Sequence, residues 1–165
     1  MNIKFEVKMT EKIMYNFLLH HAYNSVSVLI GNVFGILVAA LGVTMMADDA
    51  GKGVMYLLLG AAVIIYTPVS LYLSSKRQVK SSEVFRNPIT YTISEEGLAS
   101  SQKETTTEAG WDSMVKVVST SKSIIVYTGK NRATILPKEA MGDQYENVVQ
   151  MISTHVEPSK VKIRS

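Results

Sequence analysis

Two long stretches of this 165-residue chain contain no charged side chain. Neither residues 13–47 nor residues 53–75 include an Asp, Glu, Lys or Arg. Within them, the apolar runs 26–47 and 54–73 would measure about 33 and 30 Å as helices, enough to cross a hydrocarbon core of about 30 Å. Two buried helices of a soluble bundle are the alternative, but a bundle helix needs a polar stripe, and neither run has one. The pattern predicts two transmembrane helices.

A short polar segment, residues 48–53, separates the two runs and favours a tight connection between antiparallel helices. Basic residues flank the runs unequally. Three precede the first run, four follow the second and one lies between them: Lys4, Lys8 and Lys12; Lys76, Arg77, Lys80 and Arg86; and Lys52. Because Lys and Arg favour cytoplasmic loops, we expect a multi-pass protein of the cell membrane with both termini in the cytoplasm.

Small residues four positions apart mark one face of the first run. Gly31 and Gly35 have the spacing that lets two helix backbones approach closely. They could form a seam between two copies of the chain, or they could pack against Gly60 and Ala61 in the second run, which is the interpretation we favour. Asn32 would be costly against lipid, so we expect it on the same helix-packing face.

Apolar and charged residues alternate over residues 3–9, which is typical of a half-buried strand. Thr10 then suits the N-cap of a helix that continues into the first span. Since a lone strand is unstable, we expect residues 3–9 to pair with strands beyond the hairpin. The hairpin would then be an insertion within one fold.

Beyond Arg86 the pattern predicts short strands separated by turns, followed by one amphipathic helix. The expected strands are 89–93, 98–102, 105–111, 114–120, 123–128 and 132–136. Asp143 and Glu146 have the spacing of a capping box at the start of the helix. Its apolar stripe consists of Tyr145, Val148, Val149, Ile152 and Val156.

Together these elements predict an α+β membrane protein: a two-helix transmembrane hairpin plus a small β-barrel of pleckstrin-homology (PH) type, closed by a C-terminal helix. The expected organisation has four parts. They are the first strand in 1–10, the hairpin in 11–75, the PH-like cytoplasmic domain in 83–157 and a flexible tail in 158–165.

Several short motifs resemble those of the YcxB-like family, small bacterial membrane proteins with two spans and a PH-like cytoplasmic domain. The matching features are the initial strand, the hairpin, residues 93–98, Gly110-Trp111 followed by Val115, Val117 and Val118, the apolar run 124–127, and residues 135–138. The resemblance implies the fold described above. It implies no particular activity.

Charge and composition exclude some classes of protein. The chain has a net charge of +3, but residues 87–165 hold nine basic and nine acidic side chains, so the cytoplasmic part is neutral. Nucleic-acid binders need a basic face, and we expect no nucleic acid as a partner. The excess charge sits at Lys76, Arg77 and Lys80, where it could attract anionic lipid or serve only to fix the topology.

No residue set in the sequence suggests catalysis. His20 and His21 are adjacent, whereas a helical metal pair needs i, i+4 spacing, so we interpret them as interfacial residues. We therefore expect no enzyme activity, no cofactor and no metal. Trp111 and Pro137 are interpreted as anchors of the cytoplasmic domain, with a groove-lining role as the alternative for Trp111.

The leading hypothesis is a non-enzymatic, membrane-tethered interaction module that binds a protein or a lipid headgroup. Its expected partners are the lipid bilayer, including anionic lipid, and a membrane or cytoplasmic protein or a second copy of the chain. The alternative is an accessory subunit, or a transporter-associated component, that acts through its transmembrane helices.

Overall fold

The computed structural model describes residues 2–129 and 132–163. The chain divides into two compact units. The larger unit combines Met1–Phe17 with Gln78–Ser165, and the hairpin unit is Leu18–Arg77.

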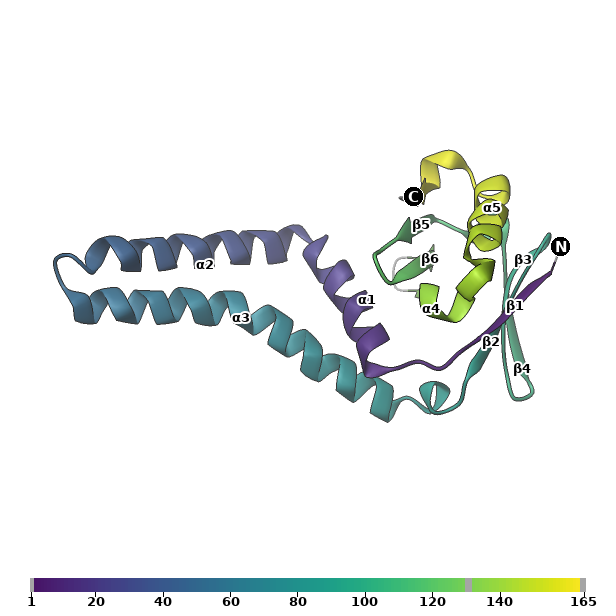
Figure 1. The fold of residues 1–165 in the computed structure, drawn as a ribbon, viewed down its shortest axis with the longest axis horizontal. Coiled ribbons are helices and arrows are strands. Elements are labelled where there is room, and N and C mark those ends of the chain that lie inside the picture. Colours follow the sequence, from purple (N-terminus) through teal and green to yellow (C-terminus); the bar gives the residue numbers. More distant parts are fainter. Residues whose placement is uncertain (1, 130–131, 164–165) are drawn as a thin grey trace. The chain divides into compact units, whose positions relative to one another are not determined.

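Two long antiparallel helices, α2 (Val26–Met45) and α3 (Ala50–Ser81), form most of the hairpin unit (Figure 1). Their most apolar windows have mean hydropathies of 2.3 and 2.0, and only 17% and 6% of these windows is buried within the chain. Both helices are therefore long and apolar enough to cross a membrane. Asp49 precedes α3 and caps its N-terminus, because its Oδ1 accepts a hydrogen bond from the backbone N–H of Lys52 at 3.0 Å.

A separate helix, α1 (Glu11–Tyr23), precedes α2. Thr10 caps it as predicted, since the Thr10 hydroxyl accepts a hydrogen bond from the N–H of Ile13 at 3.2 Å. The predicted continuation into the first span is wrong, because the chain breaks at Asn24 and Ser25. The Asn24 amide donates to the carbonyl of His20 at 2.6 Å, and Ser25 is extended. Asn and Ser side chains compete in this way with the backbone bonds of a helix.

The first sheet of the larger unit has the strand order β1-β2-β3-β4. Its strands are β1 (Ile3–Val7), β2 (Ile89–Ser94), β3 (Gly97–Gln102) and β4 (Thr105–Gly110). β1 pairs antiparallel with β2, with Ile3 opposite Ile93. The strand that precedes the hairpin thus pairs with one that follows it, as expected, and its residues alternate between buried and exposed.

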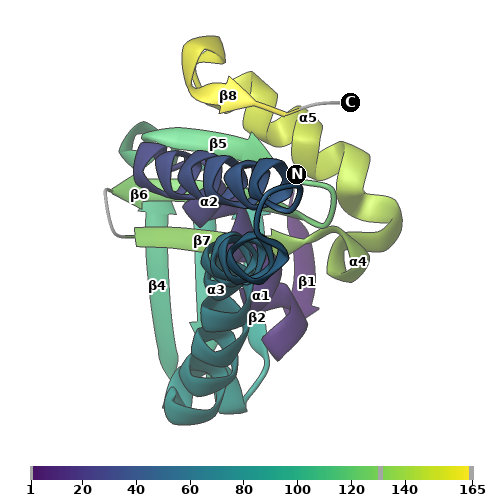
Figure 2. The same cartoon turned by 90° about the vertical axis from the view of Figure 1, so that its left-hand side faces the viewer.

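The second sheet has the order β7-β6-β5-β8. Its strands are β5 (Lys116–Ser119), β6 (Ser123–Gly129), β7 (Arg132–Pro137) and β8 (Val161–Lys162). The expected flexible tail, 158–165, differs from what is found. Pro158–Lys160 forms a 3-10 turn, and Val161 pairs in parallel with Val117, which gives this apolar residue a partner (Figure 2). Residues 164–165 of that tail lie outside the described residues.

The C-terminal helix α5 (Tyr145–His155) follows a short helix, α4 (Lys138–Met141), and a 3-10 turn over Gly142–Gln144. The predicted capping box is wrong, because α5 begins at Tyr145 and no side chain caps it. Gly142, at φ +50°, ends α4 and places Asp143 inside the 3-10 turn. The predicted apolar stripe is confirmed: Val148, Ile152 and Val156 are at most 3% exposed.

A single hydrophobic core joins both sheets to α5. It includes Ile93 and Leu98 from the first sheet, Val117 and Ile124 from the second, and Ile152 from α5. Strands of one sheet run across those of the other in Figure 2. The larger unit is therefore an α+β fold with two sheets. Between the described strands the two sheets share no ladder, so a closed barrel is not confirmed.

Burial of Tyr91 on β2 should make the larger unit less stable at alkaline pH. Its side chain is 5% exposed, and burial raises its pKa to about 12, against about 10 in an unfolded chain. As the pH rises, the Tyr91 hydroxyl therefore loses its proton in the unfolded chain before it does so in the folded one. The stability that the protonated, buried side chain contributes is complete below about pH 10 and is lost as the pH rises towards 12. Between pH 9 and pH 11 the protein should therefore lose about 1.4 kcal/mol of stability through this group, and we expect Tyr91→Phe to abolish that loss. Urea unfolding of the wild type and of Tyr91→Phe at pH 9 and pH 11 measures this loss. If both proteins lost the same free energy of unfolding between the two pH values, the assignment to Tyr91 would be contradicted.

Candidate functional site

Trp111 connects the turn between β2 and β3 to the rest of the larger unit. It begins a 3-10 turn (Trp111–Ser113) directly after β4. Its side chain is 9% exposed, and its indole N–H lies 3.2 Å from the carbonyl oxygen of Ser94 and 3.0 Å from that of Glu95. The turn itself requires a glycine, because Gly97 has φ +146° and a Cβ there would collide with the carbonyl of Ala109.

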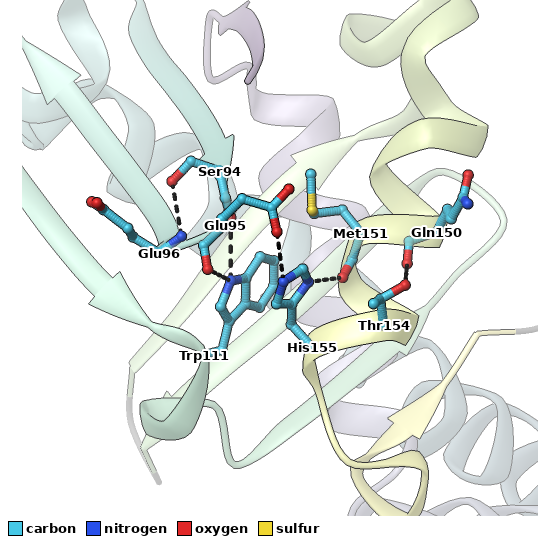
Figure 3. A network of polar contacts seen from close by, with 8 residues as sticks. All are labelled: Ser94, Glu95, Glu96, Trp111, Gln150, Met151, Thr154 and His155. Atoms are coloured by element: carbon cyan, nitrogen blue, oxygen red, sulfur yellow. Dashed lines mark hydrogen bonds and ion pairs between the residues drawn. The ribbon is translucent and has the colours of Figure 1, made fainter. Parts of the chain in front are cut away.

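His155, at the end of α5, packs on this tryptophan. The two rings are stacked with centroids 5.0 Å apart (Figure 3). Nδ1 of His155 lies 3.0 Å from the carbonyl of Met151, and Nε2 lies 3.0 Å from Oε2 of Glu95. Both partners are acceptors, so a neutral ring can donate to only one of them, whereas an imidazolium donates to both. This network ties α5 to the β2–β3 turn.

A cavity of about 550 Å³ opens beside the β2–β3 turn. It is lined by residues of β2, β3 and β4, and its charged lining residues are Glu95, Glu96 and Glu108. The surrounding segment, residues 89–110, holds four Glu and one Lys. Within the neutral stretch 87–165 this segment is therefore locally acidic, which favours a basic ligand.

The cavity adjoins an open strand edge. Among the described strands, β4 pairs only with β3, and five of its six residues are exposed. Gln102 and Thr105 flank the two-residue turn between these strands and face each other in the ladder. By the alternation of antiparallel pairing, the N–H groups of Thr106 and Glu108 then point away from β3. Such an edge can accept an additional strand.

The two predicted domain anchors lie in different places. Trp111 belongs to the hydrophobic core, an arrangement that fits an anchor better than an exposed groove aromatic. Pro137 is buried at the end of β7, opposite Ser123, and immediately precedes α4. The structure does not bring these two residues into one site.

The predicted basic cluster lies along the C-terminal part of α3. Lys76 is half-buried, with Nζ 4.6 Å from the centroid of the Tyr72 ring. Arg77 and Lys80 are exposed, and Lys80 lies 4.0 Å from Glu11 on α1. The three residues therefore share one helix end, and their role towards lipid stays a prediction.

The predicted helix-packing residues separate into two groups. A Cβ on Gly35 would lie 2.9 Å from a side-chain carbon of Ile64 and 3.2 Å from the carbonyl of Gly60, so Gly35 packs within the hairpin. A Cβ on Gly31 would have no atom within 4 Å, and Asn32 is half-buried. Sequence reasoning missed a second close approach, in which Gly42 contacts Gly53.

Comparison with known proteins gives one match. Residues 93–152 match the family model described as YcxB-like protein, the same family that the sequence motifs resemble. No curated protein and no solved structure matches the chain.

Proposed function

We propose, with the similarity of residues 93–152 to the YcxB-like family model as one support, that this chain is a non-enzymatic interaction module tethered to the cell membrane. In this proposal α2 and α3 span the bilayer, with both termini in the cytoplasm. Support comes from the apolarity of the two helices and from the seven basic residues that flank them, against one between them. The exposed faces of α2 and α3 would then contact lipid.

We infer that the larger unit is a PH-like domain. The support is its order of elements: four antiparallel strands, then three more in β5, β6 and β7, then the helix α5 packed on a core shared by both sheets. In such a domain the strand edges and the cavities between loops are the available binding surfaces.

The surface we assign to partner binding is the edge of β4. The single observation that carries this assignment is an open, exposed strand beside a cavity lined by three glutamates. The fitting partner is an extended segment of a membrane or cytoplasmic protein that carries basic side chains. Its backbone would pair with the edge of β4, and its cations would lie near Glu96 and Glu108.

Site-specific photo-crosslinking of the full chain in its native membrane tests this function. A photoreactive residue at Thr107 should yield protein adducts, whereas one at Lys4, exposed on the opposite edge strand, should yield few. Thr106→Pro removes an outward N–H and should reduce the Thr107 adducts at least tenfold, while proline remains tolerable at an edge. Thr106→Val keeps the N–H and serves as the control. Equal adducts in both variants would refute binding at this edge.

A second candidate function, action through the membrane helices, is favoured by Gly31. Its open surroundings leave a small residue on α2 available to another chain, next to the half-buried Asn32. If a second chain packs there, Gly31→Leu should abolish function while Thr106→Pro leaves it unchanged. Energy transfer between labelled copies in liposomes would show whether that chain is a second copy.

A further inference from the structure

A second cavity, of about 340 Å³, lies in the larger unit where three separate segments meet. These segments are the beginning of α1, the turn between β5 and β6, and the junction of β7 with α4. The polar residues that line the cavity are Lys12, Asn16, Ser121, Lys122, Lys138 and Glu139, together with Ser123. It is distinct from the acidic cavity beside the β2–β3 turn.

The lining of this cavity carries an excess of positive charge. Three lysines face one carboxylate, that of Glu139. Across residues 2–129 and 132–163, no acidic side chain lies within ion-pair distance of Lys12, Lys122 or Lys138. Lys138 instead has its Nζ 4.9 Å from the centroid of the Tyr145 ring. The described residues of the lining therefore leave the cavity with a net positive charge.

The segments that carry these lysines are held by hydrogen bonds. In the β5–β6 turn, the Thr120 hydroxyl accepts from the N–H of Lys122 at 3.2 Å and from that of Ser123 at 2.9 Å. The N–H of Lys138 donates to the carbonyl of Lys122 at 2.9 Å, which joins the turn to the start of α4. Because the backbone is already ordered, a ligand would need to order only the side chains.

We propose that this cavity binds a phosphate group through Lys12, Lys122 and Lys138, and that the phosphate belongs to the headgroup of an anionic phospholipid. A phosphate offers several oxygens and can accept hydrogen bonds from more than one ammonium at once. The hydroxyl of Ser121 and the amide of Asn16 can donate to the remaining oxygens. The lipid source rests on the proposed membrane location, since α1 leads into α2. A soluble phosphate ester has the same chemistry.

The test uses the full chain in phosphatidylcholine nanodiscs and follows acetylation of each lysine by mass spectrometry. Phosphatidylglycerol at increasing mole fraction should slow acetylation of Lys12, Lys122 and Lys138 several-fold, and should leave Lys116, an exposed lysine of the same unit, unchanged. A parallel series adds glycerol 3-phosphate to nanodiscs without phosphatidylglycerol. This series measures whether the phosphate binds without its lipid.

A matched pair of variants distinguishes binding in the cavity from general attraction between the positive charge of the protein and anionic lipid. Lys122→Gln should raise the phosphatidylglycerol fraction needed for half-protection of Lys12 and Lys138 about fivefold, the factor for about 1 kcal/mol per lysine. Lys116→Gln removes the same charge outside the cavity and should change nothing. Equal shifts in the two variants, or no protection by either ligand, would overturn the site.

The protection given by phosphatidylglycerol and by glycerol 3-phosphate is compared to find whether the bound phosphate belongs to a lipid or to a soluble ester. Protection by phosphatidylglycerol alone supports a lipid headgroup, whereas equal protection by glycerol 3-phosphate overturns the lipid source. Failure of the proposed function would look different. In that case the Thr107 adducts would be missing although the three lysines are still protected.

Discussion

Replacing Trp111 by alanine is expected to lower the free energy of unfolding of the larger unit by about 3–5 kcal/mol. The substitution empties a buried site, removes the ring that stacks on His155, and leaves the carbonyls of Ser94 and Glu95 without the indole donor. Since domains of this size are stable by only about 5–15 kcal/mol, this loss would remove a large share of the total. Hydrogen exchange of β2 and β3 in the full chain measures the loss.

Trp111→Phe is the matched control. It keeps most of the buried area and a ring beside His155 but lacks the N–H, so its loss of stability should be intermediate. A loss below about 1 kcal/mol in Trp111→Ala would contradict the anchor interpretation, because such values are typical of exposed positions. If Trp111 lined a binding groove instead, the alanine variant would lose partner adducts without losing stability.

The second large effect is expected in the hairpin unit, for Gly60→Ala. The added Cβ would lie 2.6 Å from the backbone nitrogen of Ala39 and 2.6 Å from the carbonyl oxygen of Gly35. Backbone atoms cannot rotate away as side chains do, so α2 and α3 must separate, at a cost of about 1–3 kcal/mol. Gly31→Ala adds the same atom with nothing within 4 Å, and it should be neutral.

The lack of cysteine makes this separation easy to measure. Cysteines introduced at Val33 and Ile65, both exposed positions of the hairpin helices, can carry spin labels in an otherwise label-free chain. The distance between the labels should increase in Gly60→Ala and remain the same in Gly31→Ala. Unchanged distances in both variants would show that the glycine contact does not set the helix spacing.

Local periodicity made much of the fold predictable. The apolar runs, the alternation in β1 and the stripe on α5 are each encoded within one segment. The errors have two different causes. The break at Asn24 is local, because the Asn24 side chain bonds back to the carbonyl of His20 in the preceding turn. β8 depends on a non-local contact, since Val161 pairs with Val117 of β5 and no pattern within its own short segment predicts that pairing.

The candidate sites were harder to predict. The balance of nine acidic and nine basic residues after residue 86 conceals the acidic segment 89–110, which lines one cavity, and the basic cavity draws its lysines from three separate segments, one of them before the hairpin. Glu95 and His155 are 60 residues apart, and the three lysines come from three segments. The sequence singled out Trp111, whose role as an anchor stays a prediction, but it gave no sign of its ring partner His155.

The pairing of β1 with β2 also has a consequence for how the protein is made. During translation the first strand leaves the ribosome before the hairpin, and its partner strand emerges only after both helices have been synthesised. Until then β1 has no neighbour, and the first sheet must remain incomplete. The larger unit can therefore complete its folding only after the hairpin has been synthesised, and a chain that stops within α3 exposes an unpaired strand that is prone to aggregate.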